Sequence, residues 1–109
     1  MADKYHLKFS KKNIWRKWKR EILNDLNTAV FTTKYVLNNN SPILYVYHYK
    51  EDGAWTFLGI ESLIDEDYRV VPLEEIFNID SSILKIVSLE LGYCACRKSR
   101  EAKWIAKNL

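Results

Sequence analysis

The stretch ILYVYHYKEDGAWTFLG, residues 43–59, decides the fold of this chain. Side chains of residues 43–50 alternate between two faces that are both mostly apolar or aromatic, which is typical of a strand inside a sheet. The pair Asp52-Gly53 favours a two-residue turn, because glycine adopts a positive φ without strain. Residues 54–59 would then return beside the first strand. We therefore predict an antiparallel hairpin.

The length of the turn sets which side chains meet across this hairpin. With a two-residue loop, Lys50 lies opposite Trp55 and His48 lies opposite Phe57. These four side chains are predicted to share one face of the sheet. Alternating side chains of the same two strands, among them Tyr45, Tyr47, Tyr49, Thr56 and Leu58, are predicted to lie on the other face.

Strand signals continue on both sides of the hairpin. Residues 28–37 are rich in β-branched and aromatic side chains and end at the turn signal NNNSP, so we predict a strand there. Residues 68–72 fit either a short strand or an extended entry to a helix. Two further strands are predicted near the C-terminus, in YCACRKS and KWIAKNL.

Helix signals occur in two other parts of the chain. Pro72 fits the start of a short helix, and Asp80 or Ser81 can cap a second one, so we predict a helical insert near residues 72–89. Residues 11–26 are predicted to form an amphipathic helix, because apolar side chains recur every four residues along one stripe: Ile14, Trp18, Ile22 and Leu26.

Together these segments predict an α+β fold. The 109 residues suffice for one domain with its own core. We therefore predict a single domain over residues 1–109, with sheet and short helices in residues 28–107. In it, the helix at residues 11–26 packs on an antiparallel sheet of about five strands.

Charge is distributed unevenly along the chain. Residues 1–30 carry eight basic and three acidic side chains, whereas residues 40–92 carry three basic and ten acidic ones. Residues 93–109 are basic again, with five basic side chains and one acidic. If the termini pack together, one side of the domain is basic and another is acidic.

Neither a membrane span nor a secretory signal is evident. No run approaches the ~18 apolar residues of a membrane span. The N-terminal sequence MADKYHLKFSKK lacks the apolar core of a secretory signal. We therefore expect a cytoplasmic protein that does not bind membranes.

Motifs for catalysis and metal binding are absent from the sequence. It contains no Gly-rich phosphate loop, no nucleophile elbow and no zinc-binding spacing. Cys94 and Cys96 are expected to be reduced thiols on one face of a strand, because an i, i+2 pair has poor geometry for a disulfide. His48 lies near Asp52 but has no positioned nucleophile beside it. We predict a protein that is not an enzyme and that uses no cofactor and no metal.

Two kinds of binding partner fit the charged and aromatic side chains. A protein partner would be met by residues of the hairpin and the acidic loop after it: Asp52, Trp55, Glu61, Asp65, Glu66 and Asp67. A nucleic acid would be met by the basic face of the N-terminal helix, because lysine and arginine neutralise phosphates. That basic face comprises Lys12, Arg16, Lys17, Lys19 and Arg20. Both sets also fit solvated surface, and Trp55 also fits core packing.

The order of features between about Ala29 and Ile83 resembles a known family. The relevant segments are AVFTTKYVL, SPILYVYHYKEDGAWTFLGIE and RVVPLEEIFNIDSSI. They are similar to a domain family of small bacterial proteins proposed, from gene neighbourhood, as immunity proteins of polymorphic toxin systems. Gly59 matches the glycine expected after the aromatic strand, whereas Ser81 replaces the proline common in that family's helix start.

The resemblance covers about half of the chain and implies a function. It implies a bacterial, non-enzymatic inhibitor that neutralises the toxin domain it binds. Inhibitors of nucleases often present carboxylates to a basic active site, and such charge complementarity speeds association. The acidic middle of the chain is therefore the expected face, and nucleic-acid binding by the basic helix is the alternative function.

Overall fold

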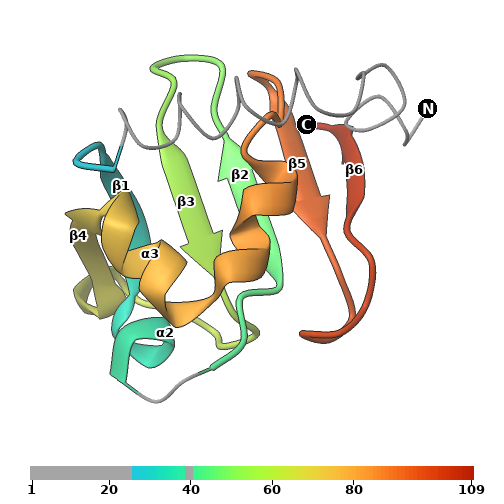
Figure 1. Ribbon diagram of the computed structural model, residues 1–109. Coiled ribbons are helices and arrows are strands. Elements are labelled where there is room, and N and C mark those ends of the chain that lie inside the picture. The colour runs from blue at the N-terminus through green and yellow to red at the C-terminus, as the bar shows by residue number, and fades with distance from the viewer. Residues whose placement is uncertain (1–25, 39–40) are drawn as a thin grey trace.

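The computed structural model describes residues 26–38 and 41–109. The predicted helix at residues 11–26 therefore lies outside the described residues, except for Leu26, which is in a turn. The fold is α+β, with several short helical segments and one mixed sheet (Figure 1). Within the described part of the chain, no helix combines the length and the apolar character needed to cross a membrane.

The sheet has six strands in the order β4-β1-β3-β2-β5-β6. Their bounds are β1 (Ala29–Thr33), β2 (Tyr45–His48), β3 (Trp55–Leu58), β4 (Tyr68–Pro72), β5 (Tyr93–Cys96) and β6 (Ile105–Asn108). All neighbouring strands are antiparallel except β1 and β3, which are parallel. The expected antiparallel sheet of about five strands is confirmed in part: the sheet has six strands, and one of its five strand pairs is parallel.

Two local features explain this difference. The segment predicted as either a strand or an extended entry is β4, and it pairs with β1 along its whole length, from Ala29 opposite Pro72 to Thr33 opposite Tyr68. The β2–β3 hairpin meets β1 through its second strand, which makes that pair parallel. Periodicity within a strand does not specify which edge of a hairpin meets a third strand.

The predicted strand at residues 28–37 ends earlier than expected. Helix α2 (Lys34–Asn38) follows β1 directly. Its first turn is capped by Thr33, whose Oγ1 accepts a hydrogen bond from the backbone N–H of Val36 at 3.2 Å. Thr33 is β-branched and therefore suits a strand, but its hydroxyl also accepts a hydrogen bond from a backbone N–H of α2. Strand β1 ends at Thr33 for this reason.

The predicted helical insert near residues 72–89 is confirmed. It consists of α3 (Leu73–Ile79) and the 3-10 helix η3 (Ser81–Ile86), preceded by the short 3-10 helix η2 (Asp65–Asp67). Pro72 directly precedes α3. Asp80 caps η3, because its Oδ1 accepts from the backbone N–H of Ser82 at 3.0 Å. Both helices of the insert pack on one face of the sheet (Figure 1).

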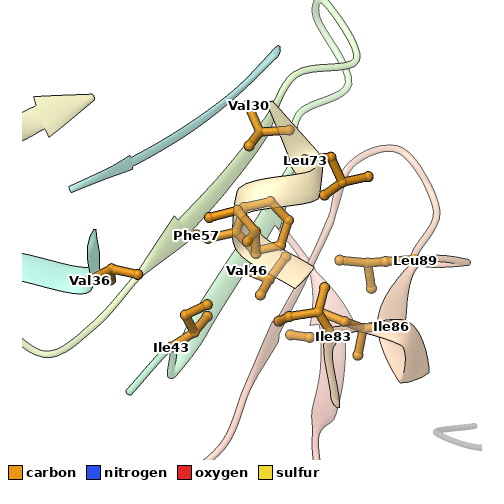
Figure 2. Packing of buried hydrophobic residues seen from close by; sticks show 11 residues of the cluster. Val30, Val36, Ile43, Val46, Phe57, Leu73, Ile83, Ile86 and Leu89 are labelled. Atoms are coloured by element: carbon orange, nitrogen blue, oxygen red, sulfur yellow. The ribbon is translucent and has the colours of Figure 1, made fainter. Parts of the chain in front are cut away.

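The hydrophobic core lies between this insert and the sheet. Val46 and Phe57, at the centre of the sheet, are at most 1% exposed. Figure 2 shows Phe57 beneath α3, with Val46 next to it and Ile83 and Ile86 on the neighbouring helical segment. Burial of side chains of this size stabilises the fold by about 1.5–3 kcal/mol each.

The central hairpin has a different register from the predicted one. His48 pairs with Trp55 and Val46 with Phe57, so the loop spans residues 50–53 rather than two residues. Gly53 closes the loop at φ +73°, and its N–H donates to the carbonyl of Tyr49 at 2.9 Å. Because the register differs by two residues, every strand side chain keeps its predicted face. Two positions predicted for residues 43–50 are wrong. Lys50 lies in the loop, and Ile43, predicted on the face of Tyr45 and Tyr47, precedes β2 and is buried in the hydrophobic core.

Candidate binding surfaces

The face of the sheet opposite α3 and η3 carries two rows of side chains that run across all six strands. The register aligns the first row as Val70, Phe31, Thr56, Tyr47, Cys94 and Lys107. Two residues further along each strand, and therefore on the same face, the second row comprises Tyr68, Thr33, Leu58, Tyr45, Cys96 and Ile105. These residues are called the open face below.

Large apolar side chains dominate the open face. The exposed fraction is 41% for Phe31, 61% for Val70, and 40% for both Tyr45 and Tyr68. On the outer strand β6, Ile105 is 58% exposed. Apolar contact area is thus present on both halves of the sheet, on β4 and β1 and on β2 and β6.

The Tyr47 hydroxyl and the Cys94 thiol, which are neighbours on the open face, are uncharged near neutral pH. Burial is the main cause that raises the pKa of Tyr47, and it also raises the pKa of the Cys94 thiol next to it. The Tyr47 ring stacks on Tyr49, with ring centroids 5.8 Å apart and planes within 8°. Lys107 is the single ionised side chain in the two rows. Such a surface can bind apolar and aromatic groups and donate hydrogen bonds.

The acidic residues predicted to meet a protein partner lie at opposite ends of the sheet. Asp52 is exposed at the tip of the β2–β3 hairpin, where its Oδ1 accepts from the N–H of Ala54 at 2.9 Å. Asp65 and Glu66 are exposed in η2, beyond the far end of β3. The structure therefore brings Asp65 and Glu66 together but not Asp52.

Asp67 and Glu61 have contacts within the fold. Asp67 is 3% exposed, and its carboxylate accepts from the N–H of Ile64 at 3.0 Å and pairs with Lys34 at 3.4 Å. Glu61 accepts a hydrogen bond from the Ser41 hydroxyl, and its Oε1 is buried without a partner among the described residues. Both carboxylates hold the loop between β3 and β4.

Trp55 lies on the helix-covered face of the sheet and is half-buried. Its ring stacks on His48 at a centroid distance of 3.9 Å and on Phe57 at 6.0 Å. The Nδ1–H of His48 donates to the carbonyl of Leu89 at 2.7 Å, which ties the strand to the end of the helical insert. Both rings therefore contribute to the packing of the domain.

The residues predicted to bind nucleic acid all lie outside the described residues: Lys12, Arg16, Lys17, Lys19 and Arg20. Within residues 26–38 and 41–109, no three side chains of His, Cys, Asp and Glu are grouped as metal ligands. Cys94 and Cys96 are both free thiols and share one face of β5, as predicted; that face is the open face, on which Cys94 is buried and Cys96 half-buried.

Sequence reasoning missed a buried ion pair between the helical insert and β5. Arg97 is 5% exposed, and its Nη2 lies 2.6 Å from Oδ2 of Asp80. The same guanidinium donates to the carbonyl of Ile43 at 3.0 Å, to that of Arg100 at 3.0 Å and to the Ser82 hydroxyl at 3.1 Å. Nothing local in the sequence distinguishes Arg97 from the exposed basic residues around it.

Ser82 and Arg97 together keep the buried Asp80 carboxyl ionised. Burial by itself raises the pKa of this carboxyl, but hydrogen bonds from Ser82 and Arg97, together with the charge of Arg97, lower it further than burial raises it. The net effect is a lowered pKa, so the carboxylate is ionised near neutral pH. The positive charge of Arg97 is thus compensated inside the domain.

A cleft of about 500 Å³ opens beside this ion pair, between η3 and the strands β5 and β6. Ala95 and Ala106, which pair across the two strands, are part of its lining together with Ile86 and Trp104. The Trp104 ring packs on the Arg97 guanidinium at 4.2 Å. The charged residues that line it on the exposed side are Lys85, Arg100, Glu101 and Lys103.

Comparison with known proteins does not assign this chain to a family. No protein-family model matches the chain, and no significant match was found among curated proteins or solved structures. The function proposed below therefore rests on the open face, on the exposed carboxylates beside it and on the family resemblance.

Proposed function

We propose that this protein is a non-enzymatic protein-binding module and that the open face is its main contact surface. The observation that carries the proposal is that, among residues 26–38 and 41–109, helices cover only one face of the sheet. Helices α3 and η3 bury one face, whereas five large side chains on the other are 40–61% exposed: Phe31, Tyr45, Tyr68, Val70 and Ile105. Tyrosine and phenylalanine are enriched at protein interfaces, because they bury much area at little cost in entropy.

The size of the open face agrees with such a role. Six strands spaced ~4.8 Å apart, with two rows and their flanking residues covering roughly 15 Å along each strand, present roughly 400 Å² in projection. The largest apolar patch on a typical monomeric protein covers about 300–600 Å² and is often functional, and the open face falls within this range. The side chains that project from the sheet make the accessible area larger still.

The charge of the open face favours a protein over a nucleic acid. Aromatic rings on a sheet can stack on bases, but binding a nucleic acid also requires cations along the phosphate backbone. The open face offers Lys107 alone. A neutral surface rich in tyrosine is better matched by an apolar surface of another protein.

The exposed carboxylates indicate what kind of protein the partner is. Asp65 and Glu66 lie in η2, which directly precedes Tyr68 at one end of the open face. A partner whose binding surface is basic beside an apolar patch would meet both features at once. We therefore propose, from this arrangement and the family resemblance, a cytoplasmic bacterial protein that inhibits a toxin domain with a basic active site.

Affinity capture with paired variants tests this proposal. The tagged wild-type protein is incubated with extract of the native cells, and captured proteins and RNA are quantified. Tyr45→Arg and Tyr68→Arg should each abolish capture of a stoichiometric protein. Ile60→Arg is the matched control, because Ile60 is 74% exposed but lies in the loop after β3.

Asp65→Lys combined with Glu66→Lys should slow association of the same partner at low salt, because the carboxylates steer a basic surface. If capture is equal for the wild type and both tyrosine variants, the open face is not the contact surface. Recovery of RNA in place of a protein would favour nucleic-acid binding instead.

A further inference from the structure

We infer that the cleft between η3 and β5–β6 is a binding site for a small anionic ligand with a planar apolar body, such as an aromatic carboxylate or an aromatic phosphate ester. The cleft lies on the helix-covered side of the sheet, whereas the open face lies on the other side. The inference is therefore independent of the proposed protein-binding function.

The shape of the cleft follows from two small side chains. Ala95 and Ala106 pair across β5 and β6, and their methyl groups leave the space above the strands unfilled. Ile86 of η3 supplies an apolar wall. The volume of about 500 Å³ falls within the ~300–1,000 Å³ typical of small-molecule sites. An apolar ring fits this lining better than a polar chain does.

Trp104 is held in place as a further wall of the cleft. Its ring packs against the guanidinium of Arg97 at 4.2 Å. That guanidinium is itself held by Asp80 and by backbone carbonyls, including that of Ile43. Side chains held in this way lose little additional freedom when a ligand binds, and this preorganisation favours affinity.

The charge around the cleft selects an anion. Asp80 already neutralises Arg97, so Arg97 does not contribute to the excess of positive charge around the cleft. Among the remaining charged lining residues, the three cations Lys85, Arg100 and Lys103 face a single carboxylate, Glu101. All four are exposed. A ligand whose acidic group stays near these cations, while its ring lies over the alanines, satisfies both parts of the cleft.

A matched pair of probes tests the inference. 1-Naphthoate and 1-naphthylmethylammonium share the same ring and carry opposite charges. Binding to the full chain is followed by changes in amide NMR shifts. We expect 1-naphthoate to move the resonances of residues 82–86 and 95–106, and the cation to bind at least tenfold more weakly. 1-Naphthyl phosphate, measured in parallel, distinguishes a preference for phosphate from one for carboxylate.

Variants locate the site. Lys103→Glu should weaken binding of the anion by about three- to tenfold, as expected for reversal of an exposed charge. Lys98→Glu is the matched control, because Lys98 is exposed on the same turn but does not line the cleft. Ala106→Leu should fill the cleft and abolish binding. If that variant does not fold, the comparison of Lys103 with Lys98 decides the question alone.

Three results would overturn the inference. The first is equal binding of the anionic and cationic probes. The second is equal affinity of the Lys103→Glu and Lys98→Glu variants. The third is a set of shift changes centred on Tyr45 and Tyr68, because the ring would then be bound to the open face. That third result would leave the proposed protein-binding function intact.

Discussion

Replacement of Arg97 by methionine should destabilise the domain more than any other substitution of a charged residue among those described. Methionine keeps much of the apolar stem but removes the charge and all the donors. The Asp80 carboxylate, whose side chain is 7% exposed, then loses its partner at 2.6 Å. The carbonyls of Ile43 and Arg100 lose donors at 3.0 Å as well.

The magnitude follows from the burial of both partners. Breaking a buried ion pair by removing one member costs about 3–5 kcal/mol, because an uncompensated charge stays inside the protein. Domains of this size have free energies of unfolding of about 5–15 kcal/mol. The Arg97→Met substitution should therefore remove a large part of the total stability and lower Tm by roughly 15–30 °C.

Urea unfolding, followed by tryptophan fluorescence and circular dichroism, measures this effect. Arg100→Met is the control, because Arg100 is exposed and loses no buried ion pair. Asp80→Asn in the Arg97→Met background should recover at least about 1 kcal/mol, because it removes the unpaired charge and keeps an acceptor for Ser82. The reasoning is refuted if Arg97→Met unfolds within 1 kcal/mol of Arg100→Met, or if the double variant is no more stable than the single one.

Three smaller effects are expected elsewhere. The pKa of Asp80 is lower in the folded state than in the unfolded state, so its contribution to stability is complete above the unfolded value of about 3.9 and is lost as pH falls through the folded value. Asp80→Asn should flatten that acid limb of a plot of unfolding free energy against pH. Thr32→Val should cost about 1–2 kcal/mol in urea unfolding, because the buried hydroxyl donates to the Phe57 carbonyl at 2.8 Å. Gly53→Ala should cost about 1–2 kcal/mol, because φ is +73° there while the nearest atom to an added Cβ is 4.0 Å away. A loss below 0.3 kcal/mol in either variant would contradict its stated cause.

Local chemistry made several elements of the fold predictable. Pro72 and Asp80 mark the helix starts, because one lacks a backbone donor and the other supplies a side-chain acceptor. The faces of the hairpin strand side chains were predicted correctly, although the predicted register was wrong. A register shift of two residues leaves each side chain on the same face of the sheet. These features depend on residues close together in the sequence.

The remaining features depend on residues far apart in the sequence. The parallel pairing of β1 with β3 depends on which edge of the hairpin is free, and the sequence of β1 does not encode that. Arg97 and Asp80 are 17 residues apart and meet only after the insert has packed on β5. The sequence indicated acidic and aromatic binding residues, but it did not indicate that Asp52 and Asp65 would lie at opposite ends of the sheet. Nor did it indicate that aromatic side chains would remain uncovered on one face.

The place of β2 in the sheet also has a consequence for biosynthesis. Strand β2 pairs with β3 on one side and with β5 on the other, and the β5 side becomes available only after the chain has been made past residue 96. Arg97, which neutralises Asp80 and anchors the carbonyl of Ile43, is translated directly after that strand. The nascent chain therefore keeps β2 without its second neighbour, and Asp80 without its partner, until residues 93–97 have left the ribosome.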